Sequence, residues 1–331
     1  MDSDVLIQTE NLHVRFSRQK EPDIYAVRSL NLTLKEKETL ALVGESGSGK
    51  TTTGQTLVRL LRPNLGTIRF NGEDVSRIRG KSLARYHSRA QLIFQDPFAS
   101  LNPFHTVSYH LQRPLRRLRK LSSKEAREAC SELLAQVGLT PHATFENKYP
   151  HELSGGQRQR VAIARSLAAN PLFIVADEPI SMLDVSLRAG ILQLLESLQA
   201  KQGLTYLYIT HDLASARYLS QRIAVLYGGS LAEIATAEDL VQHPAHPYTQ
   251  LLLQASVQSP GKEAVPLPEK HPGAPDLSMN RPGCPFAPRC LYAWKKCEEE
   301  MPQLIPIAPH HKVACFLTSS PPEKPNNVQG P

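Results

Sequence analysis

The chain has 331 residues, 41% of them apolar and 21% charged, and its formal net charge is +7 from 38 basic and 31 acidic residues. This composition is typical of a soluble globular protein with room for two domains, and it excludes disordered and fibrous chains. No stretch approaches the roughly 18 consecutive apolar residues of a membrane span, the first ten residues do not read as a secretory signal, and the basic excess is too mild to predict a nucleic-acid partner. We therefore expect a cytosolic protein.

The first 95 residues predict the beginning of an α/β core. Short β-rich runs, among them SLNLTL, ETLALVG, GTIRFNG and AQLIFQ, follow one another between residues 5 and 95, and one helix is expected after a glycine-rich loop. That loop, VGESGSGKTT over residues 43–52, matches the pattern G-x-x-x-x-G-K-[ST] of a phosphate-binding P-loop. A glycine-rich turn without a ligand is the alternative interpretation.

The chemistry of a P-loop accounts for these residue types. Glycines allow backbone N–H groups to converge on phosphate oxygens at the positive end of the following helix. Lys50 is expected to reach the β- and γ-phosphates and Thr51 to ligate magnesium. The loop alone leaves kinases, GTPases and ATPases open. The predicted nucleotide-binding residues of the loop are Gly44, Glu45, Ser46, Gly47, Ser48, Gly49, Lys50, Thr51 and Thr52.

From about residue 98 to 155 the chain turns helical and basic. The segment YHLQRPLRRLRKLSSKEAREACSELLAQVGL carries Leu133, Leu134 and Val137 at helical spacing, with no strand in between. We expect an inserted helical subdomain here. Cys130 falls within it and is expected to be a buried apolar residue.

The run LSGGQRQR over residues 153–160 comes directly before an amphipathic helix. Ser154, Gly155 and Gly156 would present a hydroxyl group and free backbone N–H groups at the start of that helix, where anions bind well. The chain therefore has two predicted anion-binding helix starts. A second phosphate site in one subunit needs an explanation.

Residues 156–257 return to alternating strands and helices, and LFIVADEP is the most informative of the strands. Its apolar run ends in Asp177 and Glu178 at the carboxyl edge of a predicted parallel sheet, where ligands bind in such folds. Asp177 is positioned to hold magnesium through water, and Glu178 to polarise the water that attacks the γ-phosphate. An acidic helix cap after a strand is the alternative.

The composition changes again after residue 257, because more than half of the 26 prolines fall in the last 74 residues. We expect three parts: a nucleotide-binding domain over 1–257 that includes the helical subdomain of about 98–155, a small C-terminal module over 258–320, and a disordered tail over 321–331.

Taken together, these motifs resemble the nucleotide-binding subunit of an ABC transporter, in which LSGGQ is the signature motif. The resemblance covers about residues 5–320, and the motifs occur in the family's order. It implies an α/β fold: a P-loop NTPase core of the ABC ATPase type with an antiparallel β subdomain, an inserted helical subdomain and a small cysteine-containing C-terminal module. It also implies that two subunits pair head to tail, so that ATP lies between the P-loop of one and the signature motif of the other, Leu153, Ser154, Gly155, Gly156 and Gln157.

The resemblance also assigns roles near the γ-phosphate. Gln95 in IFQDP is similar to the glutamine that senses the γ-phosphate, contacts the transmembrane partner and joins Thr51 and Asp177 as a magnesium ligand. His211 in YITHD is similar to the switch histidine that supports hydrolysis alongside Glu178. The simpler interpretations are a polar residue at a strand end and a structural histidine.

Two further matches are looser. Asp184 lies in SMLD, which resembles a loop usually written S-A-L-D whose aspartate communicates across the dimer, and Met182 departs from that pattern. Tyr25 lies 25 residues before Lys50 and resembles the aromatic residue that stacks on adenine. An ordinary surface or core tyrosine is the alternative.

Within the family, FQDPFASLNPFHTV, HPAHPYTQLLLQAS and the proline-rich tail resemble the ATPases of oligopeptide, dipeptide and nickel importers. The expected function is ATP hydrolysis that energises uptake of peptides or a related solute; nickel or an oligosaccharide is the alternative cargo, and a soluble ABC ATPase of DNA repair or translation is the weaker alternative. The resemblance implies a peripheral position on the cytoplasmic face of the inner membrane. The implied partners are two transmembrane permeases, a second identical or homologous ATPase and an extracytoplasmic solute-binding protein, with no nucleic acid.

Four cysteines stand close together near the end of the chain with the spacing C-x5-C-x6-C-x17-C. Their segment is too short and proline-rich to build a core of its own, which suggests that something else holds it together. Zinc and unligated thiols are both open, while disulfides are disfavoured in the cytosol. The resemblance to peptide-importer ATPases implies a four-iron, four-sulfur (4Fe–4S) cluster on Cys284, Cys290, Cys297 and Cys315, beside the ATP and Mg²⁺ of the nucleotide site.

Overall fold

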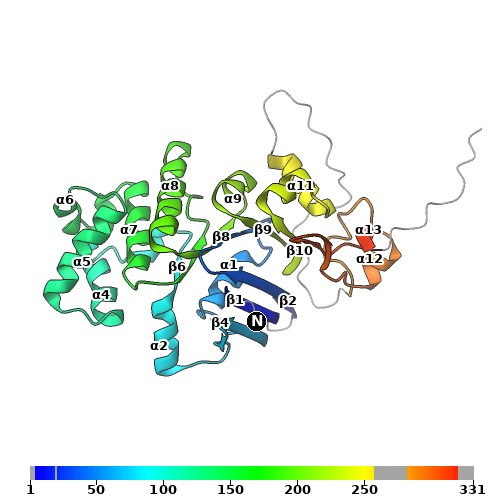
Figure 1. The fold of residues 1–331 in the computed structure, drawn as a ribbon, viewed down its shortest axis with the longest axis horizontal. Helices are drawn as coiled ribbons and strands as arrows, with labels where there is room; N and C mark the ends of the chain where they lie inside the picture. Colours follow the sequence, from blue (N-terminus) through cyan, green and yellow to red (C-terminus); the bar gives the residue numbers. More distant parts are fainter. Residues whose placement is uncertain (1–3, 19–20, 257–281, 320–331) are drawn as a thin grey trace, which may run out of the picture.

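The computed structural model describes residues 4–18, 21–256 and 282–319. Two sheets organise the chain: a four-stranded antiparallel sheet and an eight-stranded mixed sheet, with helices around them (Figure 1). The α/β fold class and the antiparallel β subdomain implied by the resemblance are thereby confirmed. The predicted tail over 321–331 lies outside the described residues.

The smaller sheet is built from the N-terminal strands in the order β2-β1-β4-β5. All its pairings are antiparallel, and β1 is the central partner of both β2 and β4. At Gly66 (φ 85°) an added Cβ would collide with the carbonyl oxygen of Asn11, so the entry into β4 requires glycine. The strands are β1 (Val5–Arg18), β2 (Glu21–Lys35), β4 (Leu65–Phe70) and β5 (Glu73–Asp74).

The larger sheet has the order β11-β12-β10-β9-β3-β8-β7-β6, and the strands from β9 to β6 are parallel. Its central strands are apolar on both faces, as expected for a parallel sheet covered on both sides. In β3, Leu40 and Leu42 face one core cluster and Ala41 and Val43 the other. The strands are β3 (Thr39–Val43), β6 (Ala90–Ile93), β7 (Phe173–Asp177), β8 (Thr205–Thr210), β9 (Arg222–Tyr227) and β10 (Ser230–Thr236).

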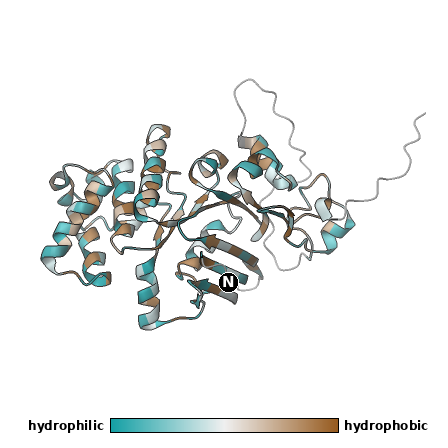
Figure 2. Ribbon diagram, in the orientation of Figure 1, coloured by the Kyte–Doolittle hydropathy of each residue, from teal (hydrophilic) through white to brown (hydrophobic). Residues whose placement is uncertain are grey.

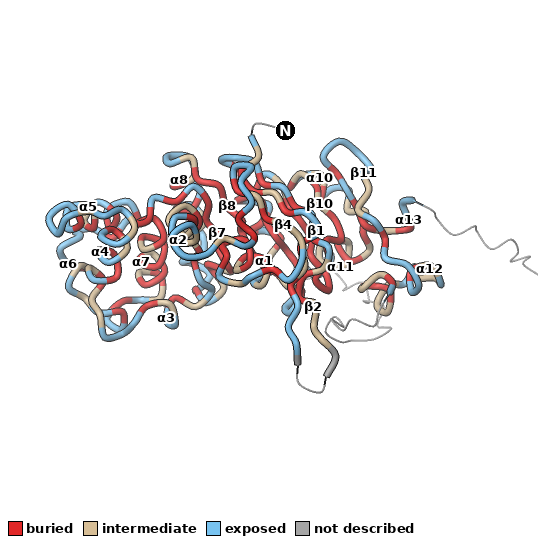
Figure 3. Tube along the Cα trace, turned by 90° about the horizontal axis from the view of Figure 1, so that it is seen from below, coloured by how far each residue is buried: buried red, intermediate tan, exposed pale blue. Residues whose placement is uncertain are grey.

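Helices cover both faces of this sheet, and Figure 3 shows the buried chain concentrated in its strands. The sequence predicts one helix between residues 5 and 95, whereas the structure has a second, α2. Tyr86 is the only buried residue of this mostly polar helix, and Leu83, one turn before it, is half-buried. The helices are α1 (Lys50–Leu57), α2 (Gly80–Arg89), α8 (Val185–Gln202), α9 (Leu213–Leu219), α10 (Ala237–Gln242) and α11 (Pro247–Ser256).

A group of helices forms one end of the molecule, on the left of Figures 1 and 2, with its brown apolar faces turned toward one another. Leu111, Leu115, Leu134 and Val161 meet in its interior. Cys130 is fully buried among them, as predicted, and burial raises its thiol pKa to about 12. The elements are α3 (Pro97–Ser100), α4 (Val107–Leu118), α5 (Ser123–Gln136), α6 (His142–Glu146), the 3-10 turn η1 (Pro150–Glu152) and α7 (Gly155–Leu167).

The described part of the C-terminal segment continues the large sheet. Strand β12 pairs with β10, so this segment shares its sheet with the nucleotide-binding core instead of standing apart from it. Around these strands lie short helices and the four cysteines. The elements are α12 (Lys295–Glu299), β11 (Ile305–Ala308), β12 (His311–Val313) and α13 (Phe316–Ser319). Over the residues that the structure covers, no helix has the length and apolar character needed to cross a membrane.

Candidate functional site

The P-loop lies between β3 and α1, and at two of its glycines the backbone is packed too closely for a side chain. At Gly44 an added Cβ would collide with the carbonyl oxygen of Leu226, and at Gly49 (φ 100°) with that of Ala26. The loop is therefore fixed against strands from both sheets. Gly49 is the N-cap of α1, so the helix begins at Lys50 with its positive end facing the loop.

Lys50 is buried beneath the loop, with a relative exposure of 5%. Its Nζ donates hydrogen bonds to the carbonyl oxygens of Gly44 at 2.8 Å and Glu45 at 2.9 Å. Burial lowers the pKa of the ammonium group, and the carboxylates of Glu178 and Asp177 oppose that shift. The structure thus holds a cation in the curve of the P-loop, where it can meet phosphate oxygens.

Thr51 and Asp177 lie together at the floor of the site. The Thr51 hydroxyl donates to Oδ1 of Asp177 at 3.1 Å. Burial is the main cause that raises the pKa of Asp177 to about 6, assisted by the charge of Glu178 and opposed by the Thr51 hydrogen bond and Lys50. A hydroxyl and a buried carboxylate are ligand types that Mg²⁺ prefers, so the pair can serve a magnesium ion.

Two predicted residues, Gln95 and His211, converge on the Glu178 carboxylate. Gln95 Nε2 donates to Glu178 Oε2 at 3.1 Å, and His211 Nδ1 lies 3.5 Å from the same oxygen. The residues follow β6, β7 and β8, which are neighbours in the parallel sheet, so their carboxyl ends bring the side chains together. Glu178 has φ 43°, in the left-handed region that non-glycine residues rarely adopt. Such strain is common at functional sites.

Tyr25 lies beside the P-loop, on β2. The next residue, Ala26, is the one whose carbonyl oxygen closes on Gly49. The Tyr25 ring carries the guanidinium of Arg28 at 5.6 Å and meets the ring of His13 edge-on at 6.2 Å. Stacking of the Tyr25 ring on a nucleotide base stays a prediction.

The predicted second anion site is at the start of α7. Ser154 is its N-cap: the hydroxyl accepts from Gln157 N at 3.3 Å, and Gln157 Oε1 accepts from Ser154 N at 3.1 Å. A side chain at Gly156 would press on Leu187 of α8, so the start of α7 packs closely against α8 at this glycine. The helix start is a hydrogen-bonded capping box on the helical group.

The SMLD loop, residues 181–184, leads into α8, and exposed apolar side chains lie on and beside it. Asp184 is exposed and stands at the N-cap of α8 without a side-chain cap hydrogen bond. Met182, Val185 and Leu187 beside it are 54%, 79% and 41% exposed. Apolar side chains exposed next to this predicted anion-binding helix start are suited to be covered by another protein surface.

A groove of about 500 Å³ runs between the core and the helical group. Leu60, Phe94 and Tyr109 give it apolar walls, and Arg113 and Arg117 give it a basic edge. Gln95 comes directly after Phe94, so the groove adjoins the residue that touches Glu178. The sequence gives no sign of this groove, because its walls come from separate segments.

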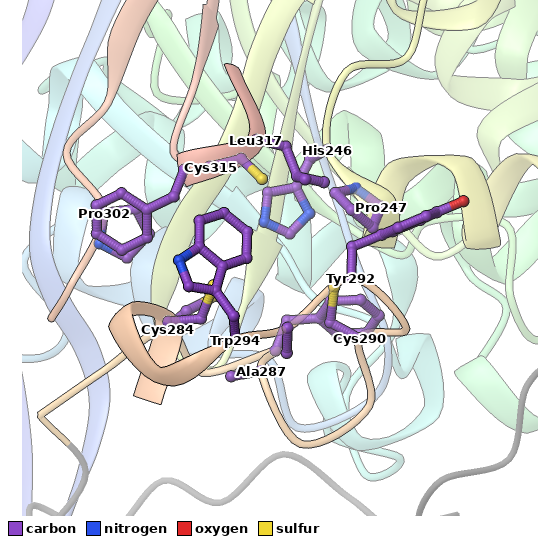
Figure 4. Close-up of a pocket in the computed structure, with 14 residues that line it drawn as sticks. His246, Pro247, Cys284, Ala287, Cys290, Tyr292, Trp294, Pro302, Cys315 and Leu317 are labelled. Carbon is purple, nitrogen blue, oxygen red and sulfur yellow. The ribbon is translucent and has the colours of Figure 1, made fainter. Parts of the chain in front are cut away.

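The four C-terminal cysteines line one small pocket together with Trp294 and His246 (Figure 4). Burial is the main cause that raises the thiol pKa of Cys284 to about 12 and that of Cys315 to about 11. Among the described residues, no group of three or more His, Cys, Asp or Glu side chains is arranged to hold a metal ion. The arrangement thus brings the predicted residues around one space without forming a single-ion site.

Sequence reasoning missed the support of Glu45. Its backbone N–H donates to the Tyr248 hydroxyl at 2.8 Å, and its carboxylate is held by Arg289. Both partners lie about 200 residues or more farther along the chain. Tyr248 stands in the HPYTQ run that was noted for its resemblance to importers, yet nothing in the sequence indicates its contact with the P-loop.

Comparison with known proteins gives two family matches: the ABC transporter family over residues 27–181 and the oligopeptide/dipeptide transporter C-terminal region over residues 232–297. The chain is 43% identical to the oligopeptide transport ATP-binding protein AppF of Bacillus subtilis (strain 168), over 91% of this chain and 92% of AppF. It is 46% identical to the oligopeptide transport ATP-binding protein OppF of Streptococcus mutans (strain UA159), over 76% of this chain and 81% of OppF.

Comparison with solved structures also gives ABC transporter ATPases. The dimeric post-hydrolysis ATP-binding cassette MJ0796, bound to ADP and Pi, matches with a TM-score of 0.63 and 32% identity, over 70% of this chain and 99% of that chain. The protein cbiO1 of Clostridium perfringens, part of the cbiONQ transporter complex, matches with a TM-score of 0.65 and 26% identity, over 72% of this chain and 92% of that chain.

Proposed function

The chain belongs to the ATP-binding subunits of ABC transporters, and we propose that it hydrolyses ATP to drive uptake of oligopeptides or dipeptides through an importer. The observation that carries the proposal is the convergence of Gln95 and His211 on Glu178, next to a P-loop with a buried Lys50. Two relatives named as oligopeptide transport ATP-binding proteins support the peptide cargo.

The geometry supports a direct sequence of steps at this site. Lys50 and the P-loop amides bind the phosphates, with Tyr25 against the base. Thr51, Asp177 and Gln95 would hold Mg²⁺, which neutralises charge that develops on the phosphates. Glu178 accepts a proton from the attacking water, and His211 lies close enough to the same carboxylate to help align the water and the γ-phosphate.

One chain provides two half-sites, which favours a head-to-tail dimer. The start of α7 at residues 153–157 would close on the ATP of a partner subunit, and the exposed apolar side chains beside Asp184 would be covered in that pairing. Closure on ATP and reopening after hydrolysis then provide the movement that transport needs. The partner is a second copy of this chain or a homologous ATPase.

The partners and the location follow from membership of the importer class. Two transmembrane permeases would rest on the ATPase pair at the cytoplasmic face of the inner membrane, and an extracytoplasmic binding protein would deliver the solute. The groove beside Gln95 suits a permease segment with apolar and acidic side chains, because its walls are apolar and its edge carries Arg113 and Arg117. The subunit is then peripheral.

Reconstitution tests the function. The chain, its permeases and its binding protein are placed in vesicles with ATP, and uptake of a peptide library, nickel and oligosaccharides is compared. We expect peptide uptake that stops with Lys50→Ala, since the substitution removes a cation held against the phosphates. Uptake of nickel or of an oligosaccharide alone would show that peptides are not the cargo. ATP turnover independent of any permease would favour a soluble ABC ATPase.

The cysteine pocket supports a finer proposal: Cys284, Cys290, Cys297 and Cys315 hold a 4Fe–4S cluster. Four cysteines around one pocket match the ligand set of such a cluster. A cluster spans more space than a single ion, so its thiolates need not meet at a single-ion distance. The group would crosslink a segment with little apolar core, and its role here is structural.

Colour and metal content test the cluster. Protein purified without oxygen should be brown, with broad absorbance near roughly 400 nm and about four irons per chain. Cys290→Ser should lower the absorbance and the iron content. Cys130→Ser should lower neither, because Cys130 is buried in the helical group, well before the four cysteines in the chain. A colourless anaerobic preparation with zinc or no metal would reject the cluster and leave the ATPase proposal intact.

A further inference from the structure

The cysteine-bearing segment is tied to the P-loop by one ion pair. Arg289, immediately before Cys290, places Nη1 2.7 Å from Glu45 Oε2 and Nη2 3.0 Å from Glu45 Oε1. The two residues are 244 positions apart in sequence. This is a bidentate pairing of a guanidinium with a carboxylate, which fixes the orientation of both side chains as well as neutralising their charges.

Aromatic rings hold the guanidinium in this direction. Arg289 Nη1 also lies 3.3 Å from the Tyr227 hydroxyl, and its Cζ lies 5.7 Å from the Tyr227 ring and 5.8 Å from the Phe286 ring. Tyr227 packs on Tyr248 with ring centroids 4.5 Å apart. Only 23% of the Arg289 side chain and 31% of the Glu45 side chain are exposed, so the pair is better shielded than a surface salt bridge.

The same contacts continue into the phosphate site. Glu45 N–H donates to Tyr248 at 2.8 Å, and the Glu45 carbonyl oxygen accepts from Lys50 Nζ at 2.9 Å. On the other side, Phe286 and Trp294 line the cysteine pocket. A continuous series of contacts therefore joins that pocket to the lysine that is expected to meet the phosphates.

We propose that Arg289 is a positioning residue for the ATP site, and that through Glu45 it couples nucleotide binding at the P-loop to the packing of the cysteine-bearing segment. The inference rests on the proposed ATPase function. Without Arg289, the Glu45 carboxylate at the start of the P-loop would lose its neutralising partner and its tie to the cysteine-bearing segment, while the hydrogen bond from Glu45 N–H to Tyr248 would remain. Coupling between two sites is reciprocal, so a bound nucleotide must also alter the cysteine-bearing segment.

The chain offers a built-in probe, because its single tryptophan, Trp294, lies in the wall of the cysteine pocket. Full-length protein labelled with 5-fluorotryptophan gives one fluorine resonance, which is followed as MgATP is added to the Glu178→Gln background. We expect nucleotide to shift this resonance. In Arg289→Met the shift should be lost at saturating MgATP, while Arg289→Lys, which keeps the charge, should show a reduced shift.

Binding and turnover provide the second readout. Arg289→Met should raise the KM for ATP about fivefold, within the usual range of coupling between sites, and leave kcat within about twofold, with Arg289→Lys in between. Arg217→Met is the matched control, since it removes an exposed ion pair with Glu238 that contacts neither the P-loop nor the cysteine pocket.

Several outcomes would overturn the inference. A Trp294 resonance that does not shift when MgATP binds to the Glu178→Gln protein with Arg289 intact would show that the two regions are uncoupled. This measurement does not depend on any Arg289 variant folding. An Arg289→Met protein that keeps the wild-type shift and KM would do the same. Absence of MgATP binding by the wild type would overturn the proposed function as well, whereas binding without a shift overturns the coupling alone.

Discussion

Glu178 concentrates the proposed chemistry in one carboxylate, which accepts from Gln95 and lies beside His211. Replacing it with glutamine keeps the size of the side chain but removes the proton acceptor. We expect Glu178→Gln to bind MgATP normally, to hydrolyse it at least about a hundredfold more slowly, and to accumulate as a closed dimer. Steady-state turnover, calorimetric binding and size-exclusion chromatography measure the three effects.

An assembled transporter whose turnover is unchanged by Glu178→Gln would remove Glu178 from the mechanism. Glu196→Gln is a matched control, because it makes the same change in an exposed carboxylate of α8 that accepts from the Tyr218 hydroxyl, outside the groove. Its turnover should stay within about twofold of the wild type.

The buried carboxylate of Asp177 lowers the stability of the nucleotide-free protein. Its folded-state pKa of about 6 lies above the ordinary 3.8, so the folded state binds the extra proton between these values and stability falls as pH rises through that window. Asp177→Asn should therefore raise the free energy of unfolding by up to about 3 kcal/mol at pH 7.5. The gain should shrink to about half at pH 5. Urea unfolding at the two pH values measures it.

The same substitution should abolish ATP hydrolysis, because Asp177 is the one anionic residue of the proposed magnesium ligands Thr51, Asp177 and Gln95. A gain in stability with a loss of activity is the expected combination for a charge kept buried for function. If Asp177→Asn were destabilising at pH 7.5, or its effect did not change with pH, burial would not be the source of the raised pKa.

At the scale of elements, substitutions of Ser154 at the start of α7 can distinguish its role as a helix cap from its proposed role in phosphate binding. Aspartate caps a helix about as well as serine, so Ser154→Asp should melt within a degree or two of the wild type. Its negative charge would oppose the γ-phosphate of a partner's ATP. In the Glu178→Gln background we expect Ser154→Asp to prevent the ATP-dependent dimer seen by size-exclusion chromatography.

Ser154→Ala is the converse variant. It loses the cap hydrogen bond to Gln157 N and should cost about 1 kcal/mol of stability, yet it brings no charge and should still dimerise with ATP. A dimer formed equally well by Ser154→Asp would argue that this helix start does not face a nucleotide.

Elements with a strong local signal could be predicted from the sequence. The strands β3, β7 and β8 are fully buried apolar runs, and the P-loop follows β3 as its spacing predicts. Helix α2 was missed because its segment is mostly polar and its apolar face consists of little more than Leu83 and Tyr86. The pairing of β12 with β10 joins segments nearly 80 residues apart, and no local pattern records such a pairing.

The site divides in the same way. Lys50, Asp177 and Glu178 are recognisable because their chemistry depends on immediate neighbours in the sequence. The bond between Arg289 and Glu45 depends on how the C-terminal segment is folded back over the P-loop, so only the tertiary structure shows it. Its residues, an arginine among prolines and a glutamate between glycine and serine, are ordinary by themselves.

At the scale of the whole molecule, Gln95 stands at the joint between the core and the helical group. It follows β6, contacts Glu178, and is followed within two residues by α3 and then by the helices whose groove is proposed to receive a permease. Movement at the γ-phosphate can pass through this short segment into the helical group. A residue so placed should matter more for coupling than for the chemical step.

Gln95→Ala in the complete transporter tests this position. We expect basal ATP turnover to fall about threefold or less, since Glu178 remains and Thr51 and Asp177 can still hold Mg²⁺. Stimulation by the peptide-loaded binding protein should fall about tenfold, because the side chain between the nucleotide and the permease is removed. Gln199→Ala is the control and should reduce neither, because Gln199 lies on α8, outside the groove, and its amide donates to the Lys37 carbonyl oxygen. Turnover with and without loaded binding protein is measured in vesicles for each variant. Equal losses of basal and stimulated turnover would assign Gln95 to hydrolysis alone and leave the coupling to other contacts in the groove.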